Sequence, residues 1–326
     1  MSKNRREFLE GLAATGAALS CGLTAAAEPA PLPTRILGKT GARVSILAMG
    51  AGSRFLMYKD EAGAIEAARK ALDSGITYID TSDDYGENHL SEHRIGKALK
   101  GRRQGIFLAT KLSNRNGAES RQTVEKGLRA LQVDQVDLIH IHSLTGEDDL
   151  ARITAKNGVL EQLTKMRDEK MTRFIGITSH TDPATLALAL ERHDFDCTQM
   201  ALNGALTGMK SGKGGMIPNP DLTTSFETTA LPVAKRKNLG VIAMKVFAQE
   251  ALLPHASPER LLRYSLSLPV ATAVVGMPKL EHITENTQLA RNFRPLSKSE
   301  MQQISGSLAP ASKAELDRFF STHIDA

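Results

Sequence analysis

Short apolar stretches alternate with amphipathic stretches along almost the whole chain. Runs rich in Ile, Val and Leu occupy 76–82, 106–112 and 136–143, and a segment with helical spacing follows each of them. This alternation predicts parallel strands joined by crossover helices, with helices covering both faces of the sheet.

The alternating pattern occurs eight times. Candidate strands begin near Ile46, Ile76, Ile106, Val136, Phe174, Cys197, Val241 and Thr272. Helical patterns follow at 61–74, 89–99, 120–131, 158–170, 182–191, 225–238, 257–267 and 281–292. Eight such units predict an α/β fold of the (β/α)8 TIM barrel type rather than an open sheet.

Additional segments extend this barrel. A β-hairpin is expected over 35–44, with Gly38 and Gly41 at its turn, and a helical C-terminal extension is expected over 297–326. The connections at 144–157 and 204–222 are longer than usual. Long connections at strand ends are often lids or cofactor straps, although a floppy loop fits them as well.

Composition agrees with one globular barrel domain over 31–326. The chain has 326 residues, of which 41% are hydrophobic and 24% are charged. Its formal net charge is +5, with both signs interspersed along the predicted helices. Because no basic stripe with interleaved aromatic residues is visible, nucleic acid is not an expected partner.

Residues 1–30 form a different kind of segment. Arg5 and Arg6 precede an uncharged run rich in Ala, Gly and Leu, and a small-residue site at 25–27 precedes a Pro-rich linker. The segment resembles a twin-arginine leader, which predicts export to the periplasm by the Tat machinery. An ordinary N-terminal helix of a cytoplasmic protein is the alternative. The run is too short for a stable membrane span.

The two cysteines are consistent with export of a prefolded protein. Cleavage after Ala27 would remove Cys21 and leave Cys197, so the mature chain could form no internal disulfide. Lipid attachment at Cys21 is an open alternative, but Ala18 opposes it because such sites carry a large aliphatic residue at that position. We expect a monomer.

Four polar side chains lie at the ends of three consecutive predicted strands. They are Asp80, Tyr85, Lys111 and His142. In a parallel barrel these ends meet at one rim, so an acid, a phenol, an amine and an imidazole are predicted to form a proton-transfer site. His140 faces the same way as His142 but lies one layer deeper, and we expect it to be a core residue.

The order and spacing of these four residues resemble the catalytic tetrad of the aldo-keto reductases, a family with this barrel fold. The similarity spans about 35–294 and includes RILGKTGARVS, YGENHLSEHRIGKAL, IGITSH and VVGMPKLEHITEN. The resemblance implies reduction of a carbonyl by hydride, or the reverse reaction on an alcohol.

The resemblance also implies a role for each residue. Hydride transfer builds negative charge on the carbonyl oxygen, so a proton donor and a hydrogen-bond donor are needed there. Tyr85 would be the general acid or base, and Lys111 would lower its pKa. Asp80 would hold Lys111, and His142 would orient the carbonyl oxygen.

The implied cofactor is NADP or NAD. No G-x-G-x-x-G follows a strand, so a Rossmann site is not indicated. The family's cofactor contacts correspond to Gly52, Ser53, Thr178, Ser179, Gln199, Met244, Lys245, Gly276, Lys279, His282, Glu285 and Asn286. The choice between NADP and NAD stays open, because His282 stands at a frequent Arg position and charge-assisted donors normally bind a 2'-phosphate.

The pocket positions predict a polar substrate. Arg54, Ser113 and Ser143 stand where family members that act on apolar carbonyls often carry aromatic residues. A sugar or keto-sugar is therefore the expected substrate class.

Two alternative functions fit parts of the sequence. His140, His142 and His180 could belong to a metal-dependent barrel hydrolase, but the first and last strands end without a metal ligand, so no metal is expected. A non-catalytic binding protein of the same family is the second alternative, and the complete tetrad opposes it.

Overall fold

The computed structural model describes residues 30–212, 215–219 and 222–309. The predicted export leader lies almost entirely outside these residues, as do Cys21 and the last part of the predicted C-terminal extension. A compact unit begins at Pro31. None of the described helices combines the length and apolar character needed to cross a membrane.

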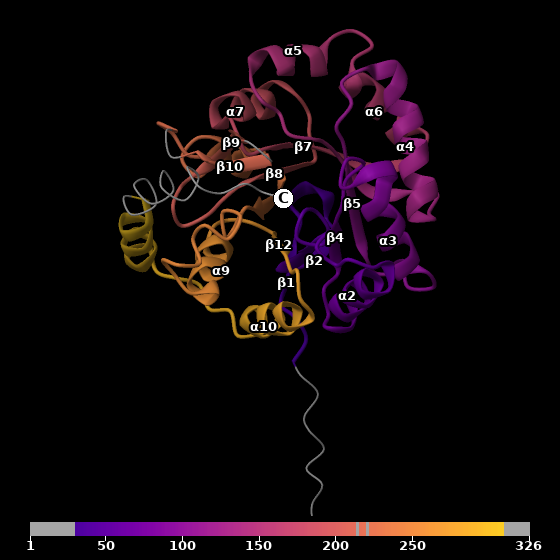
Figure 1. Cartoon of the computed structure of the whole chain (residues 1–326). Coiled ribbons are helices and arrows are strands. Elements are labelled where there is room, and N and C mark those ends of the chain that lie inside the picture. The colour runs from indigo at the N-terminus through magenta and orange to yellow at the C-terminus, as the bar shows by residue number, and fades with distance from the viewer. Residues whose placement is uncertain (1–29, 213–214, 220–221, 310–326) are drawn as a thin grey trace, which may run out of the picture. The chain divides into compact units, whose positions relative to one another are not determined.

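Eight parallel strands close into a barrel, which confirms the predicted fold class. In order around the barrel they are β3 (Leu47–Gly50), β4 (Tyr78–Asp80), β5 (Phe107–Leu112), β6 (Val136–Ile141), β7 (Thr172–Ser179), β8 (Cys197–Ala201), β11 (Gly240–Met244) and β12 (Thr272–Gly276). Pairing of β12 with β3 completes the ring, and helices surround it (Figure 1).

The surrounding helices follow the strands as the sequence predicts. They are α2 (Glu61–Asp73), α3 (Leu90–Leu99), α4 (Gly117–Leu131), α6 (Val159–Asp168), α7 (Pro183–Arg192), α8 (Ala230–Arg236), α9 (Pro258–Ser267) and α10 (Leu280–Arg291). A short 3-10 turn, η2 (Glu87–His89), precedes α3. Each helix carries its apolar face toward the barrel, which is the arrangement expected from the sequence pattern.

Two helix starts differ from the prediction by three residues or more, for local reasons. Helix α4 begins before residue 120, because the Asn116 side chain accepts a hydrogen bond from the backbone N–H of Ala118. Helix α8 begins after residue 225, because Ser225 and Thr228 hydrogen-bond each other and the nearby backbone in a turn. Local side-chain bonds of this kind compete with helix formation.

The predicted hairpin is present at the start of the described chain. Strands β1 (Thr34–Ile36) and β2 (Arg43–Ser45) pair antiparallel on either side of the 3-10 turn η1 (Gly38–Thr40). A Cβ on Gly38 would lie 2.3 Å from the backbone carbon of Leu239, so the turn can approach β11 only with glycine there. The hairpin also buries Leu37 in the cluster that contains Tyr78.

The two long connections contain regular structure. The segment after β6 includes α5 (Glu147–Thr154), and the segment after β8 includes an antiparallel hairpin of β9 (Gly208–Gly212) and β10 (Gly215–Asn219). Residues 298–309 are helical, as predicted, and bury Ile304 and Leu308 against the core.

A histidine occupies the interior of the barrel below the strand ends. His140 is fully buried, and burial holds the pKa of its imidazole well below the ordinary value. Gly176 on the neighbouring strand makes room for the ring, because a Cβ on Gly176 would lie 2.3 Å from His140 Nδ1. His140 is therefore a neutral core residue, as the sequence analysis expects.

We expect Gly176→Ala to destabilise the protein by about 1–3 kcal/mol, because the added methyl group overpacks the barrel interior. Gly306→Ala is the matched control, since a Cβ at that exposed helical position meets nothing within 4 Å and alanine favours a helix. Urea unfolding midpoints measure both effects. Equal midpoints for the two variants would contradict the assigned contact.

Candidate active site

An ion pair between two neighbouring strands lies at the centre of the site. Asp80 is the last residue of β4, and Lys111 lies near the end of β5. Lys111 Nζ is 2.6 Å from Asp80 Oδ2 and donates a second hydrogen bond of 2.8 Å to the carbonyl of Thr81. Both side chains are almost fully buried, at 2% exposure.

The turn after β4 brings Tyr85 back over this ion pair. The N–H of Tyr85 donates to the carbonyl of Ser82, and Gly86 has a positive φ of 80° that lets the chain turn away. Lys111 Nζ lies 4.6 Å from the centroid of the Tyr85 ring. A Cβ on Gly52 would lie 3.2 Å from the same ring, so the bare backbone at the end of β3 forms one wall for Tyr85.

His142 completes the group from the end of β6. Its ring meets the Tyr85 ring edge to face, with centroids 5.7 Å apart and an interplanar angle of 80°. The structure thus brings together the four side chains that the sequence places at strand ends.

Burial and charge set the protonation states of this group. Burial alone would lower the pKa of Lys111, but Asp80 and Tyr85 raise it above its ordinary value, so the ammonium stays charged. Burial raises the pKa of Tyr85 above its ordinary value, and Lys111 acts against this rise without offsetting it. Lys111 thus acts on the pKa of Tyr85 in the predicted direction, but burial of the ring outweighs it. Tyr85 carries its proton at neutral pH, as a proton donor must.

The predicted nicotinamide contacts differ in how they are engaged. Gln199 on β8 donates from Nε2 to Asp80 Oδ2 at 3.3 Å, and its Oε1 is buried without a hydrogen-bond partner among the described residues. Thr178 Oγ1 instead accepts from the N–H of Ser143 at 2.7 Å, and Ser179 donates to the carbonyl of Leu144. Gln199 therefore keeps a free acceptor, while Thr178 and Ser179 hold the connection after β6.

Cations gather at the ends of β11 and β12. Arg54 packs against Gly276, where a Cβ would lie 2.7 Å from Arg54 Cβ, and its Nε lies 3.1 Å from Glu250 Oε1. Lys245 follows Met244, the last residue of β11. Burial lowers the pKa of Lys245 to about 8, and the charges of Arg54 and Lys111 add to this shift. An anionic group placed here would favour the charged lysine.

The other predicted cofactor residues lie at the ends of β3 and β12 and on α10. Ser53, Lys279 and Glu285 are exposed, Gly52 and His282 are half-buried, and Asn286 is buried. Lys279 is the N-cap of α10 and makes no side-chain capping bond. The first N–H groups of α10 therefore suit an anion, such as a dinucleotide phosphate.

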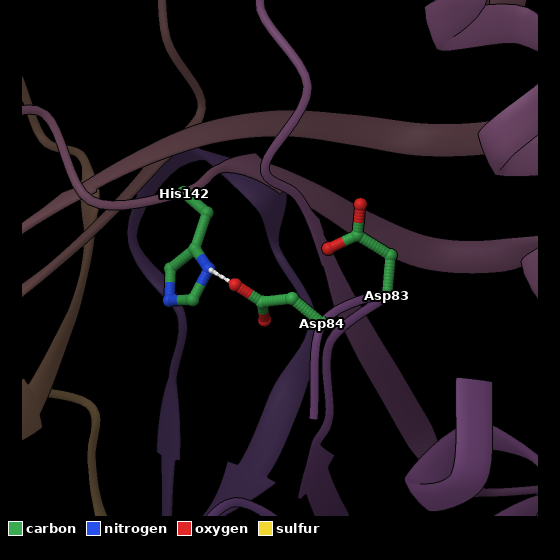
Figure 2. A group of neighbouring side chains, drawn as sticks. All are labelled: Asp83, Asp84 and His142. Carbon is green, nitrogen blue, oxygen red and sulfur yellow. Dashed lines mark hydrogen bonds and ion pairs between the residues drawn. The ribbon is translucent and has the colours of Figure 1, made fainter. Parts of the chain in front are cut away.

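A polar network around His142 was missed by the sequence reasoning. His142 Nδ1 lies 3.2 Å from Asp84 Oδ2 (Figure 2) and 3.0 Å from Ser113 Oγ. Ser113 Oγ also lies 3.0 Å from Asp83 Oδ1 and 2.7 Å from Asp84 Oδ2. The available signal was the pair of consecutive acids just before Tyr85 in TSDDYG. Ser113, predicted to line the substrate pocket, thus belongs to the support of His142.

The described structure does not bring His140, His142 and His180, the ligands of the hydrolase alternative, within reach of one metal ion. Among the described residues, the ligand atoms close enough to share a metal ion belong to Asp83, Asp84 and His142, and lie within 4.8 Å of one another. His140 and His180 are outside this group, and burial keeps the pKa of each well below its ordinary value.

Comparison with known proteins gives consistent results. The model of the aldo/keto reductase family matches residues 47–260. L-galactose dehydrogenase of Arabidopsis thaliana is 26% identical over 310 residues, covering 85% of this chain and 94% of that protein. An aldo-keto reductase from Bacillus halodurans in its holo form superposes with a TM-score of 0.68 at 25% identity, covering 84% of this chain and 96% of that one. An aldo-keto reductase from Klebsiella pneumoniae in complex with NADPH has a TM-score of 0.64 at 21% identity, covering 91% and 100%.

Proposed function

Because the chain belongs to the aldo/keto reductase family, we propose that Tyr85 moves the proton while a carbonyl and an alcohol are interconverted by hydride transfer. The observation that carries this proposal is the position of Lys111 Nζ, which lies 2.6 Å from Asp80 and 4.6 Å from the centre of the Tyr85 ring. A charged ammonium at that place stabilises the phenolate that remains after Tyr85 gives up its proton.

Each residue then has a defined task in the reduction direction. The bound nicotinamide cofactor supplies the hydride. Tyr85 transfers its hydroxyl proton to the carbonyl oxygen, which becomes the alcohol. Lys111 stabilises the phenolate, and Asp80 keeps the ammonium in place and charged. In the oxidation direction Tyr85 accepts the alcohol proton.

The residues at the strand ends fit a nicotinamide dinucleotide, NADP or NAD. The unpaired Oε1 of Gln199 suits the carboxamide, and Lys245 with the N-terminus of α10 suits the phosphates. Lys279 and His282, at the start of α10, are the candidates to bind the 2'-phosphate of NADP. The similar Klebsiella protein, described in complex with NADPH, supports the same cofactor class.

A polar substrate such as a sugar or keto-sugar fits the mouth of this barrel. Arg54, Ser113 and Ser143 stand at positions where an aromatic wall would suit an apolar carbonyl, although Arg54 pairs with Glu250 and Ser113 supports His142. Asp83 and Asp84 add carboxylate oxygens beside His142. The similarity to L-galactose dehydrogenase, which extends over 94% of that protein, supports a sugar substrate.

We also propose that the chain is exported by the twin-arginine pathway, on the basis of residues 1–30. We expect an Arg5→Lys/Arg6→Lys variant to stay in the cytoplasm, because both guanidinium groups are replaced. Cell fractionation of the full chain, with a Lys3→Arg variant as control, measures this. A periplasmic double variant would contradict the proposal.

We expect Tyr85→Phe to lower kcat about 10²- to 10⁴-fold, because the proton donor is lost. Cofactor affinity should stay unchanged, since the ring remains, and fluorescence titration with NADPH and NADH measures it. Tyr264→Phe is the matched control: it removes a phenolic hydroxyl that bonds Glu227, outside the tetrad. Full activity of Tyr85→Phe would refute the assigned role, and failure of both cofactors to bind would refute the oxidoreductase proposal.

The proposed substrate class is tested by comparing kcat/KM for sugars and keto-sugars with that for apolar aldehydes, using both cofactors. We expect the polar compounds to be the better substrates, because their hydroxyl groups pair with polar pocket groups that an apolar compound would leave unpaired. Turnover restricted to apolar aldehydes or steroids would show that the pocket has been misassigned.

A further inference from the structure

We propose that Asp84 is a positioning residue that fixes the hydrogen of His142 on Nδ1, so that the neutral ring offers Nε2 to the substrate as a hydrogen-bond acceptor. This inference rests on the proposed function, because it concerns how His142 meets the substrate oxygen. The nitrogen Nε2 lies on the side of the ring away from Asp84 (Figure 2).

Three oxygen atoms surround Nδ1 of His142. Ser113 Oγ lies at 3.0 Å, Asp84 Oδ2 at 3.2 Å and Ser82 Oγ at 3.5 Å. All three oxygens can accept a hydrogen bond from an N–H at Nδ1. Only a serine hydroxyl that points toward the ring could instead donate a hydrogen bond to Nδ1.

The serine hydroxyls already have carboxylate acceptors. Ser82 Oγ lies 2.6 Å from Asp84 Oδ1, and Ser113 Oγ lies 2.7 Å from Asp84 Oδ2. An ionised carboxylate can only accept, so each hydroxyl hydrogen is directed to a carboxylate. The lone pairs of Ser113 and of Asp84 then face Nδ1, which must carry the hydrogen.

Asp84 is ionised in this network. Although burial raises its pKa, the hydrogen bonds from His142, Ser82 and Ser113 hold the pKa of Asp84 well below its ordinary range. Asp83 has a different part: the backbone N–H of Ser113 donates to its Oδ2 at 3.1 Å, so Asp83 anchors Ser113.

The other charged and titratable groups around His142 do not compete for Nδ1. Lys111 and Tyr85 lie across the tetrad, and Arg115 donates to the backbone carbonyl of His142 at 2.6 Å. His140 and His180 interact with His142 through space, and burial keeps both of them neutral.

The position of this hydrogen determines which substrate His142 can bind. With Nδ1 protonated, a neutral ring has a lone pair on Nε2 and accepts from the hydroxyl of an alcohol. When Nδ1 already carries a hydrogen, Nε2 can donate to a carbonyl oxygen only if the ring takes up a second proton and becomes an imidazolium. Asp84 therefore makes alcohol oxidation depend on neutral His142 and carbonyl reduction depend on protonated His142.

The direct test is ¹⁵N NMR of the full chain labelled at histidine, with His142 assigned by His142→Gln. We expect neutral His142 to show a protonated Nδ1 and an unprotonated Nε2. In Asp84→Ala, the ratio of this tautomer to the Nε2–H tautomer should fall about tenfold or more, as expected for loss of a hydrogen bond to a charged group. Asp73→Asn is the matched control and should keep the wild-type tautomer, because the Asp73 carboxylate pairs with Arg102 and takes no part in the network around His142.

Steady-state kinetics provides a second readout. Asp84→Ala should raise KM for the alcohol about tenfold while changing KM for the carbonyl less. Asp84→Asn, which keeps the size of the side chain, serves if Asp84→Ala does not fold, as judged by circular dichroism. An Nε2–H tautomer in the wild-type protein, or an unchanged tautomer ratio in both Asp84 variants, would overturn the proposal.

A metal ion is the competing occupant of this cluster. Zinc titration monitored by the same ¹⁵N signals should leave His142 unchanged, and a shift of its Nδ1 signal at stoichiometric zinc would overturn the proposal. The NMR experiment measures the tautomer without any turnover. Failure of the tautomer proposal is therefore distinguishable from failure of the oxidoreductase function, which Tyr85→Phe and cofactor titration test.

Discussion

The buried ion pair between Lys111 and Asp80 is the interaction on which the rest of the barrel mouth depends. Two charges removed from water are costly unless their remaining hydrogen-bonding groups are satisfied, so such a pair is weak evidence for a gain in stability. Here the ammonium also bonds the carbonyl of Thr81, and Gln199 donates to the same carboxylate oxygen as Lys111. The arrangement is better explained by what it holds in place: a fixed positive charge under the ring of Tyr85.

The fold and the tetrad could be predicted because they follow from regular patterns. Strand ends in a parallel barrel meet at one rim, so Asp80, Lys111 and His142 had to be neighbours once the eight units were counted. The net pKa shift of Tyr85 could not be predicted in the same way. Its direction depends on how deeply the turn after β4 buries the ring, and burial outweighs Lys111.

Side chains whose partners come from distant loops were also beyond the sequence. Arg54 was expected to line the substrate pocket, yet it binds Glu250 and the carbonyl of Gln249, about 195 positions later in the chain. Ser113 reads as a polar pocket residue, but its hydroxyl lies among two carboxylates and an imidazole. Contacts of this range are set by loop conformations that strand and helix periodicity does not determine.

Gly52 has a consequence for how this site can change over time. A side chain there would press on the ring of Tyr85, because a Cβ would lie 3.2 Å from it. In the sequence the position is predicted only as a cofactor contact, and nothing there indicates its contact with Tyr85. In an evolving or engineered lineage, even an alanine at this position would require the Tyr85 ring to shift by a few tenths of an ångström, with every residue of the tetrad unchanged. The position of the Tyr85 ring can therefore be adjusted from a residue outside the tetrad.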